Sequence, residues 1–170
     1  QANDWVSPVA GKKGELAGTR GRQWRLVMAY AGFEMILKAI QQNDKSLGPD
    51  GFKQLVGKVD PPRVEIKSPA SGSKRFQEWM GKNEKILDFL NVGRGDRNVL
   101  KSWILEKKTI NDLPTAIALA KALRNATAHG ALSANKCEEL KLSDTIKELP
   151  RILFETSESV FMKLTKLKDI

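Results

Sequence analysis

The sequence holds very little cysteine, histidine or tyrosine, with one of each among its 170 residues. A single cysteine, Cys137, excludes a disulfide within one chain and leaves no cysteine cluster that could hold zinc. We expect Cys137 to be a small buried residue, and we expect no bound metal or other cofactor. One free thiol is also typical of a protein in the reducing cytoplasm, which is the location we expect.

Long apolar runs are also missing. No stretch approaches the roughly 20 apolar residues of a membrane span, and the first sixteen residues lack the apolar segment of a signal peptide. The chain does not begin with methionine, so we expect a trimmed chain or a domain excised from a longer protein. Hydrophobic residues make up 41% of the sequence, which predicts a folded domain with a core.

Acidic residues are in the minority, with 20 against 29 Lys and Arg, and the net charge is +9. This excess favours a polyanionic partner, most often nucleic acid, although it also serves solubility alone. The basic residues are spread along the chain rather than concentrated on one amphipathic helix, so a membrane surface is a weaker candidate and we expect no membrane partner.

Sustained strand alternation is rare, so we predict an all-α helical bundle of about five to seven helices. Residues 1–21, rich in Gly, Lys and Arg, predict a basic flexible arm, and residues 22–170 a single helical domain. The first helix is expected from residue 23 to about 42. Its apolar stripe is predicted to contain Trp24, Val27, Met28, Ala31, Met35 and Leu37–Ala39.

Further helices are expected over residues 51–58, 74–91 and 96–107, with a loop over 59–73 that contains at most one short extended segment near Val64. A last helical region over 135–166 is expected to break before Pro150, because proline lacks the backbone donor a helix needs. Trp24, Trp79 and Trp103 lie on apolar stripes and are predicted core residues, whereas Trp5 in the arm is free to stack or dock on a partner.

The only histidine stands in the stretch LRNATAHGAL, residues 123–132, on a predicted helix rich in alanine. Asn111 or Asp112 caps the start of this helix, Pro114 suits its first turn, and Gly130 is a plausible terminator. Asn125 and His129 are four residues apart and should share a face. Arg124 should point away from the core or into an interface.

The string RNATAHG, residues 124–130, resembles the R-N-x-x-x-H signature of HEPN domains. The resemblance implies an all-helical fold and metal-independent endoribonuclease activity, as in toxin–antitoxin, antiviral or RNA-processing systems. It also implies cleavage of RNA to 2′,3′-cyclic phosphate and 5′-OH ends, and it brings an antitoxin or regulatory protein into consideration as a partner.

The residue types suit that chemistry. Histidine exchanges protons near neutral pH, and an arginine fork matches two phosphate oxygens. We expect His129 to handle protons, Arg124 to bind phosphate and Asn125 to position them. Proton removal and proton donation need two groups, while the chain has one histidine. A symmetric homodimer supplies the second, and HEPN active sites are commonly composite and lie at a dimer interface.

Basic residues outside the motif are candidates for a path for single-stranded RNA: Arg20, Arg22, Arg94, Arg97 and Lys101. The GRGDR stretch, residues 93–97, is in addition a weak candidate for a phosphate-binding turn. Glu138 and Glu139 face different sides of a helix and are interpreted as solvated surface residues.

Two alternatives remain open. After the ribonuclease, the second hypothesis is a non-catalytic HEPN-like module that binds RNA or a partner protein, and the third is a plain helical interaction domain. In both, His129 is a structural residue that bonds a carbonyl at the helix end, and Arg124 is a surface residue.

Overall fold

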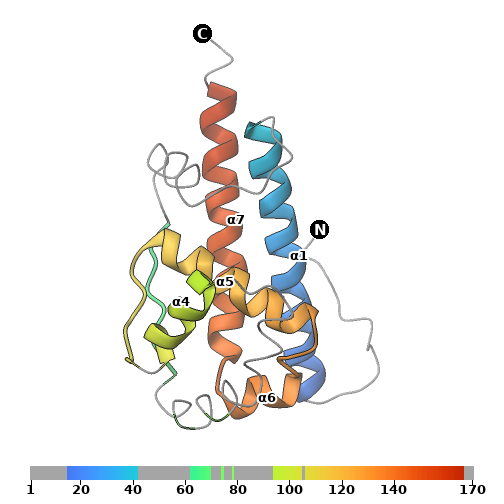
Figure 1. The fold of residues 1–170 in the computed structure, drawn as a ribbon. Helices are drawn as coiled ribbons and strands as arrows, with labels where there is room; N and C mark the ends of the chain where they lie inside the picture. The colour runs from blue at the N-terminus through green and yellow to red at the C-terminus, as the bar shows by residue number, and fades with distance from the viewer. Residues whose placement is uncertain are drawn as a thin grey trace.

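The computed structural model describes residues 15–41, 62–69, 94–104 and 106–166, together with residues 74 and 78. The described part is helical and consists of α1 (Glu15–Gln41), α4 (Arg94–Ile104), α5 (Leu113–Ala128), α6 (Ala134–Glu139) and α7 (Ser143–Lys166). These helices form an all-α bundle, as the sequence predicts (Figure 1). The expected helix 51–58, nearly all of the expected helix 74–91, Trp5 and Trp79 lie outside the described residues.

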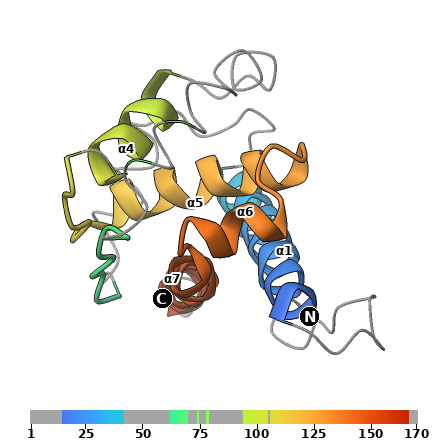
Figure 2. The same cartoon turned by 90° about the horizontal axis from the view of Figure 1, so that it is seen from below.

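The two long helices, α1 and α7, pack side by side, and α5 crosses both of them (Figures 1 and 2). The short helix α4 packs on the N-terminal part of α5, and α6 packs on α1 at the base of the bundle in Figure 1. As a result α5, which carries the RNATAHG string up to Ala128, packs against α1, α4 and α7.

A single core joins these helices, and α5 lies at its centre. Nine of the sixteen residues of α5 are buried. Alanine at many of these positions lets the neighbouring helices approach α5 closely, which explains the alanine-rich sequence. Trp103 of α4 is 1% exposed, so the prediction that it is a core residue is confirmed.

Both ends of α5 are set by local chemistry, as expected. The Asp112 side chain accepts a hydrogen bond of 2.8 Å from the Thr115 backbone N–H, and Pro114 lies in the first turn. At the other end Gly130 has φ +77°, a left-handed conformation that glycine adopts without a steric penalty. The Gly130 and Leu132 N–H groups donate back to the carbonyls of Thr127 and Ala126.

The first helix differs from the expectation in two ways. It begins at Glu15, so residues 15–21 belong to α1 rather than to a flexible arm, and residues 1–14 lie outside the described part. The predicted apolar stripe is wrong as a core face except at Leu37, which is buried. Trp24 is 43% exposed, and the buried face consists of Thr19, Gln23, Leu26, Ala29, Tyr30, Phe33 and Leu37. That face includes polar residues, which is why periodicity in apolar residues alone missed it.

The last helical region also breaks at a different place. The chain turns between α6 and α7 at residues 140–142, where Lys141 has φ +57°, and α7 then continues through Pro150. Pro150 and its neighbour Leu149 are buried in the bundle. Packing of α7 against α1 and α5 therefore offsets the hydrogen bond that proline cannot donate.

One extended segment, residues 62–69, pairs with the chain before α5. Val64 and Ile66 are buried and Glu65 between them is exposed, and Ile66 forms an isolated antiparallel bridge with Ile110. This agrees with the single short extended segment expected inside the loop. The helix expected over 96–107 is observed as α4 and ends three residues earlier, at Ile104.

Candidate functional site

Arg124 lies on α5 with its side chain directed across α1. Its Nη1 donates a hydrogen bond of 2.7 Å to Asn125 Oδ1, and its Nη2 lies 3.4 Å from Glu34 Oε2. The guanidinium carbon also stands 5.2 Å from the centre of the Tyr30 ring, in cation–π geometry. Arg124 therefore packs against α1 of the same chain.

The guanidinium remains partly accessible. The Arg124 side chain is 28% exposed and that of Glu34 is 33% exposed, so the pair sits at the edge of the α1–α5 interface. An ion pair at this exposure adds little to the free energy of unfolding. Together with the Tyr30 ring, however, it fixes the direction of the Arg124 guanidinium. This arrangement presents a preoriented cation to solvent.

Asn125 and His129 differ in environment, although they were expected to share a helix face. Asn125 is 7% exposed and lies within the core side of α5, where its side chain accepts the bond from Arg124. His129 is exposed and occupies the C-cap of α5, with φ −93° and ψ 6°. The His129 N–H still donates an α-helical hydrogen bond of 3.1 Å to the Asn125 carbonyl, so the two residues lie one turn apart, as expected. They differ in burial because Asn125 lies within the helix and His129 at its exposed end.

The backbone after His129 is held by α1. The Gln23 side chain, which is buried, donates a hydrogen bond of 2.8 Å from Nε2 to the Leu132 carbonyl. Arg124 contacts Tyr30 and Glu34 further along the same helix. The motif segment is thus fastened to α1 on both sides of His129, and the imidazole lies on a supported turn.

The structure places the predicted RNA-binding residues in two separate groups. Arg20 is exposed on α1, three residues before Gln23, whose side chain bonds the turn that follows His129. Arg22 is partly exposed and donates to Thr19 and Glu138. Arg94 is the first residue of α4, Arg97 is partly buried there and Lys101 is exposed.

The two groups differ in how they relate to the motif. The α4 group lies beside the N-terminal part of α5, away from Arg124 and His129, so the structure does not bring it to the motif (Figure 2). The GRGDR stretch contributes its last four residues to α4, so those residues form a helical turn rather than an open glycine–arginine turn.

Sequence reasoning missed two residues that contact Arg124. Glu34 is the only carboxylate between residues 16 and 43, and Tyr30 is the only tyrosine in the chain. Glu34 is the single acidic residue of the helix predicted over residues 23–42, whose other charged residues are basic. That isolated acid is a signal for a buried or partly buried ion pair, and it was available in the sequence. The sequence did not indicate which residue pairs with Glu34, because Glu34 and Arg124 are 90 residues apart.

Glu138 was interpreted as a solvated surface residue, and the structure corrects this. Its carboxylate accepts hydrogen bonds from Thr19 on α1, from Arg22 at 3.5 Å and from Ser143 at 2.8 Å. Thr19 is fully buried. Glu138 is therefore a link between α1, α6 and α7, whereas its neighbour Glu139 is exposed and pairs with Lys136, as expected of a surface residue.

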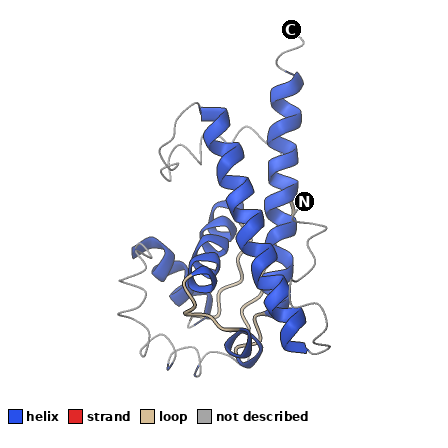
Figure 3. Cartoon of the chain, turned by 90° about the vertical axis from the view of Figure 1, so that its right-hand side faces the viewer, coloured by secondary structure: helices blue, strands red, loops and turns tan. Residues whose placement is uncertain are grey.

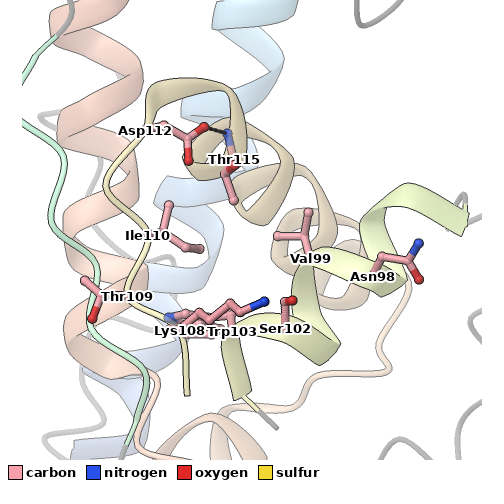
Figure 4. A pocket seen from close by; sticks show the side chains of 9 residues that line it. All are labelled: Asn98, Val99, Ser102, Trp103, Lys108, Thr109, Ile110, Asp112 and Thr115. Atoms are coloured by element: carbon pink, nitrogen blue, oxygen red, sulfur yellow. Dashed lines mark hydrogen bonds between the residues drawn. The ribbon is translucent and has the colours of Figure 1, made fainter. Parts of the chain in front are cut away.

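A pocket of about 370 Å³ lies at the other end of α5 (Figure 4). Val99 and Ile110 stand on opposite sides of it, and the Asp112–Thr115 cap forms one edge. None of its lining residues belongs to the RNATAHG string. The pocket is therefore separate from the candidate site on Arg124, Asn125 and His129.

Within the described residues, no three His, Cys, Asp or Glu side chains gather in a way that could hold a metal ion. None of the described helices combines the length and apolarity that crossing a bilayer requires. Comparisons of the chain with protein-family models, with curated proteins and with solved structures find no match.

Proposed function

We propose that this protein is a metal-independent endoribonuclease of the HEPN type that acts as a homodimer on single-stranded RNA. The observation that carries the proposal is the RNATAHG string at the end of α5, with an exposed His129 and a guanidinium preoriented by Tyr30, Asn125 and Glu34. The net charge of +9 supports a polyanionic substrate.

In the proposed reaction RNA supplies its own nucleophile. A His129 imidazole takes the proton of the 2′-OH, and the 2′-oxygen attacks the adjacent phosphorus. The bond from phosphorus to the 5′-oxygen breaks, and that oxygen receives a proton from a second, protonated imidazole. Products are a 2′,3′-cyclic phosphate and a 5′-OH, with one proton taken up and one released. Arg124 stabilises the charge that develops on the phosphate oxygens.

The test is cleavage of a labelled single-stranded RNA in the presence of EDTA. We expect His129→Ala to lower the cleavage rate by about 10²-fold or more, since general acid–base groups contribute roughly 10²–10⁴-fold. Arg124→Lys keeps the charge and loses the fork, so we expect an intermediate loss. Asn135→Ala, an exposed substitution six residues beyond His129, is the matched control and should retain full activity.

A specific observation favours a second function, a non-catalytic module that binds RNA or a partner protein. The Arg124 guanidinium already has a carboxylate, an amide oxygen and a ring as partners, a set that also suits a purely structural arginine. On this alternative, His129→Ala binds RNA as wild type does and no cyclic-phosphate ends form. End-group analysis of the RNA products decides between the two, because only the nuclease generates 2′,3′-cyclic phosphate.

A further inference from the structure

The outer side of α1 carries a second apolar face, opposite the buried one. Its residues are Gly21, Trp24, Met28, Ala31 and Met35, which follow one another at intervals of three, four, three and four residues. This is the spacing of a seam between two packed helices. Trp24 is 43% exposed, Met28 37% and Met35 71%, and no charged residue interrupts the seam. In Figure 3, α1 lies in front of α7.

Such a helix is apolar on both sides, a pattern typical of a helix that is covered all round. One side of α1 is covered by α5, α6 and α7. The other presents a tryptophan and two methionines in a chain of net charge +9. Tryptophan and methionine are enriched where protein surfaces meet and are not the residues of a surface that binds phosphate.

We propose that a second copy of this chain covers this face, with the two α1 helices antiparallel and a two-fold axis passing at Met28. An antiparallel pair about Met28 sets Trp24 of one copy opposite Gly32 of the other, and Met35 opposite Gly21. Each large side chain then meets a glycine, and Gly32 has open space where a Cβ would stand. Because the large and small residues of this face complement each other across the two-fold axis, we infer that the partner on this face is a second copy of the chain.

The charges beside the seam agree with the antiparallel direction. With the axis at Met28, Arg20 lies opposite Ile36, Arg25 opposite Ala31, and Lys38 opposite Gly18. No two like charges face each other. In a parallel pair each residue would face its own copy, so that Arg20, Arg25, Lys38 and Trp24 would each meet themselves, at a cost in repulsion and in packing.

The same axis relates the two candidate sites. Arg124 contacts Tyr30 and Glu34, and the Leu132 carbonyl contacts Gln23, so His129 lies between these two anchor points, beside the middle of α1. An axis at Met28 therefore sets the His129 residues of both copies at the same level along α1. The pairing itself is argued from α1 alone; its role in supplying a second imidazole rests on the proposed ribonuclease function.

Cysteine cross-linking in the full chain tests the register. Met28→Cys stands on the axis, so we expect oxidation with copper–phenanthroline to convert most of the protein to a disulfide-linked dimer. Met35→Cys is the matched control. Its two copies are about 21 Å apart along the helices, beyond the reach of a disulfide, and it should stay unlinked. The native Cys137 is buried and does not compete.

The mass in solution gives a second readout. We expect the wild type to sediment as a dimer, and Gly32→Leu to weaken dimerisation at least tenfold while circular dichroism stays helical. Gly18→Leu is the control, since its Cβ also meets open space but Gly18 lies opposite Lys38 of the other copy rather than opposite Trp24. Equal cross-linking of both cysteine variants, a monomeric wild type, or a Gly32→Leu dimer as tight as wild type would each overturn the proposal.

RNA cleavage separates this proposal from the proposed function. If the Met28→Cys dimer cross-links and leaves RNA intact, the α1 pairing is supported and the ribonuclease proposal is contradicted. If the protein fails the cross-linking test but cleaves RNA in a reaction that depends on His129, the ribonuclease proposal is supported and the α1 pairing is contradicted.

Discussion

Arg124 acquires its orientation from residues that lie almost a hundred positions earlier in the chain. Tyr30 and Glu34 are one turn apart on α1 and hold the guanidinium from two directions, by ring contact and by charge. Asn125, next to Arg124 in sequence, supplies the third contact. The RNATAHG string contains Arg124 and Asn125, but the geometry of the arginine depends on a helix outside the string.

Cys137 offers a prediction at the same scale. Burial, together with the neighbouring Glu138 carboxylate, raises the pKa of its thiol from 9.0 to about 11. The unfolded thiol ionises first as pH rises. Its contribution to the free energy of unfolding is therefore complete below pH 9 and is lost between about pH 9 and 11, by roughly 2–3 kcal/mol at most.

The measurement is denaturant unfolding of wild type and Cys137→Ala from pH 8 to 11. Subtracting the two removes the titration of lysines, which both proteins share. The stability advantage of wild type should shrink as pH rises. A difference that stays constant over this range would show that the folded thiol titrates like the unfolded one.

The residues of the site were predictable to different degrees. Asp112 and Gly130 follow from local chemistry, since a cap needs a short acceptor and a left-handed turn needs glycine, and the structure confirms both. The difference in burial between Asn125 and His129 was not predictable, because it depends on which side of α5 the other helices cover.

At the scale of elements, α1 shows why periodicity identifies a helix without orienting it. Two faces of α1 have the spacing of a packing seam, one through Leu26, Tyr30 and Phe33 and one through Trp24, Met28 and Met35. Apolar content favours the second, and the protein buries the first. The choice depends on Thr19 and Gln23, polar residues whose partners on α6 and in the turn after α5 are distant in sequence.

Glu138 joins three elements and therefore supports a prediction about them. Glu138→Ala removes an acceptor shared by Thr19, Arg22 and Ser143 and leaves the buried Thr19 hydroxyl without it. We expect a loss of about 1.5–3 kcal/mol in the free energy of unfolding, the range for hydrogen bonds to a charged group. Glu138→Gln keeps one oxygen acceptor and should lose less.

Urea denaturation measures these differences. Glu139→Ala, at the adjacent exposed position, is the control and should change stability by less than about 0.5 kcal/mol. Equal effects of Glu138→Ala and Glu139→Ala would mean that the three contacts of Glu138 do not couple α1, α6 and α7.

At the scale of the whole molecule, the fold class followed from the sequence because a helical period recurs along the chain and strand alternation does not. The position of the break before α7 did not follow. Proline was expected to end a helix, yet Pro150 lies inside α7 because the bundle packs around it, and the turn falls at Lys141 instead. The local tendency of proline to end a helix is overridden where the helix is extensively buried in the tertiary structure.

The net charge of +9 leads to the last prediction, which concerns RNA binding and depends on the proposed function. Lysines and arginines that neutralise phosphates release counterions, so the logarithm of the binding constant falls linearly with the logarithm of salt concentration. The slope is about −0.7 for each phosphate neutralised on a single strand. Three to five contacts on the surface around Arg124 would give a slope between about −2 and −3.5.

The contributing residues are separable by substitution. Lys121 is exposed on α5 one turn before Arg124, and Arg20 is exposed near the turn after His129, so alanine at either position should make the slope shallower by about 0.7. Lys147 is exposed on α7 beside the segment 62–69 and is the charge-matched control. Fluorescence anisotropy with the His129→Ala protein measures binding without cleavage. If Lys147→Ala changed the slope as much as Lys121→Ala and Arg20→Ala do, RNA would be binding to the basic surface as a whole rather than along α5 and α1.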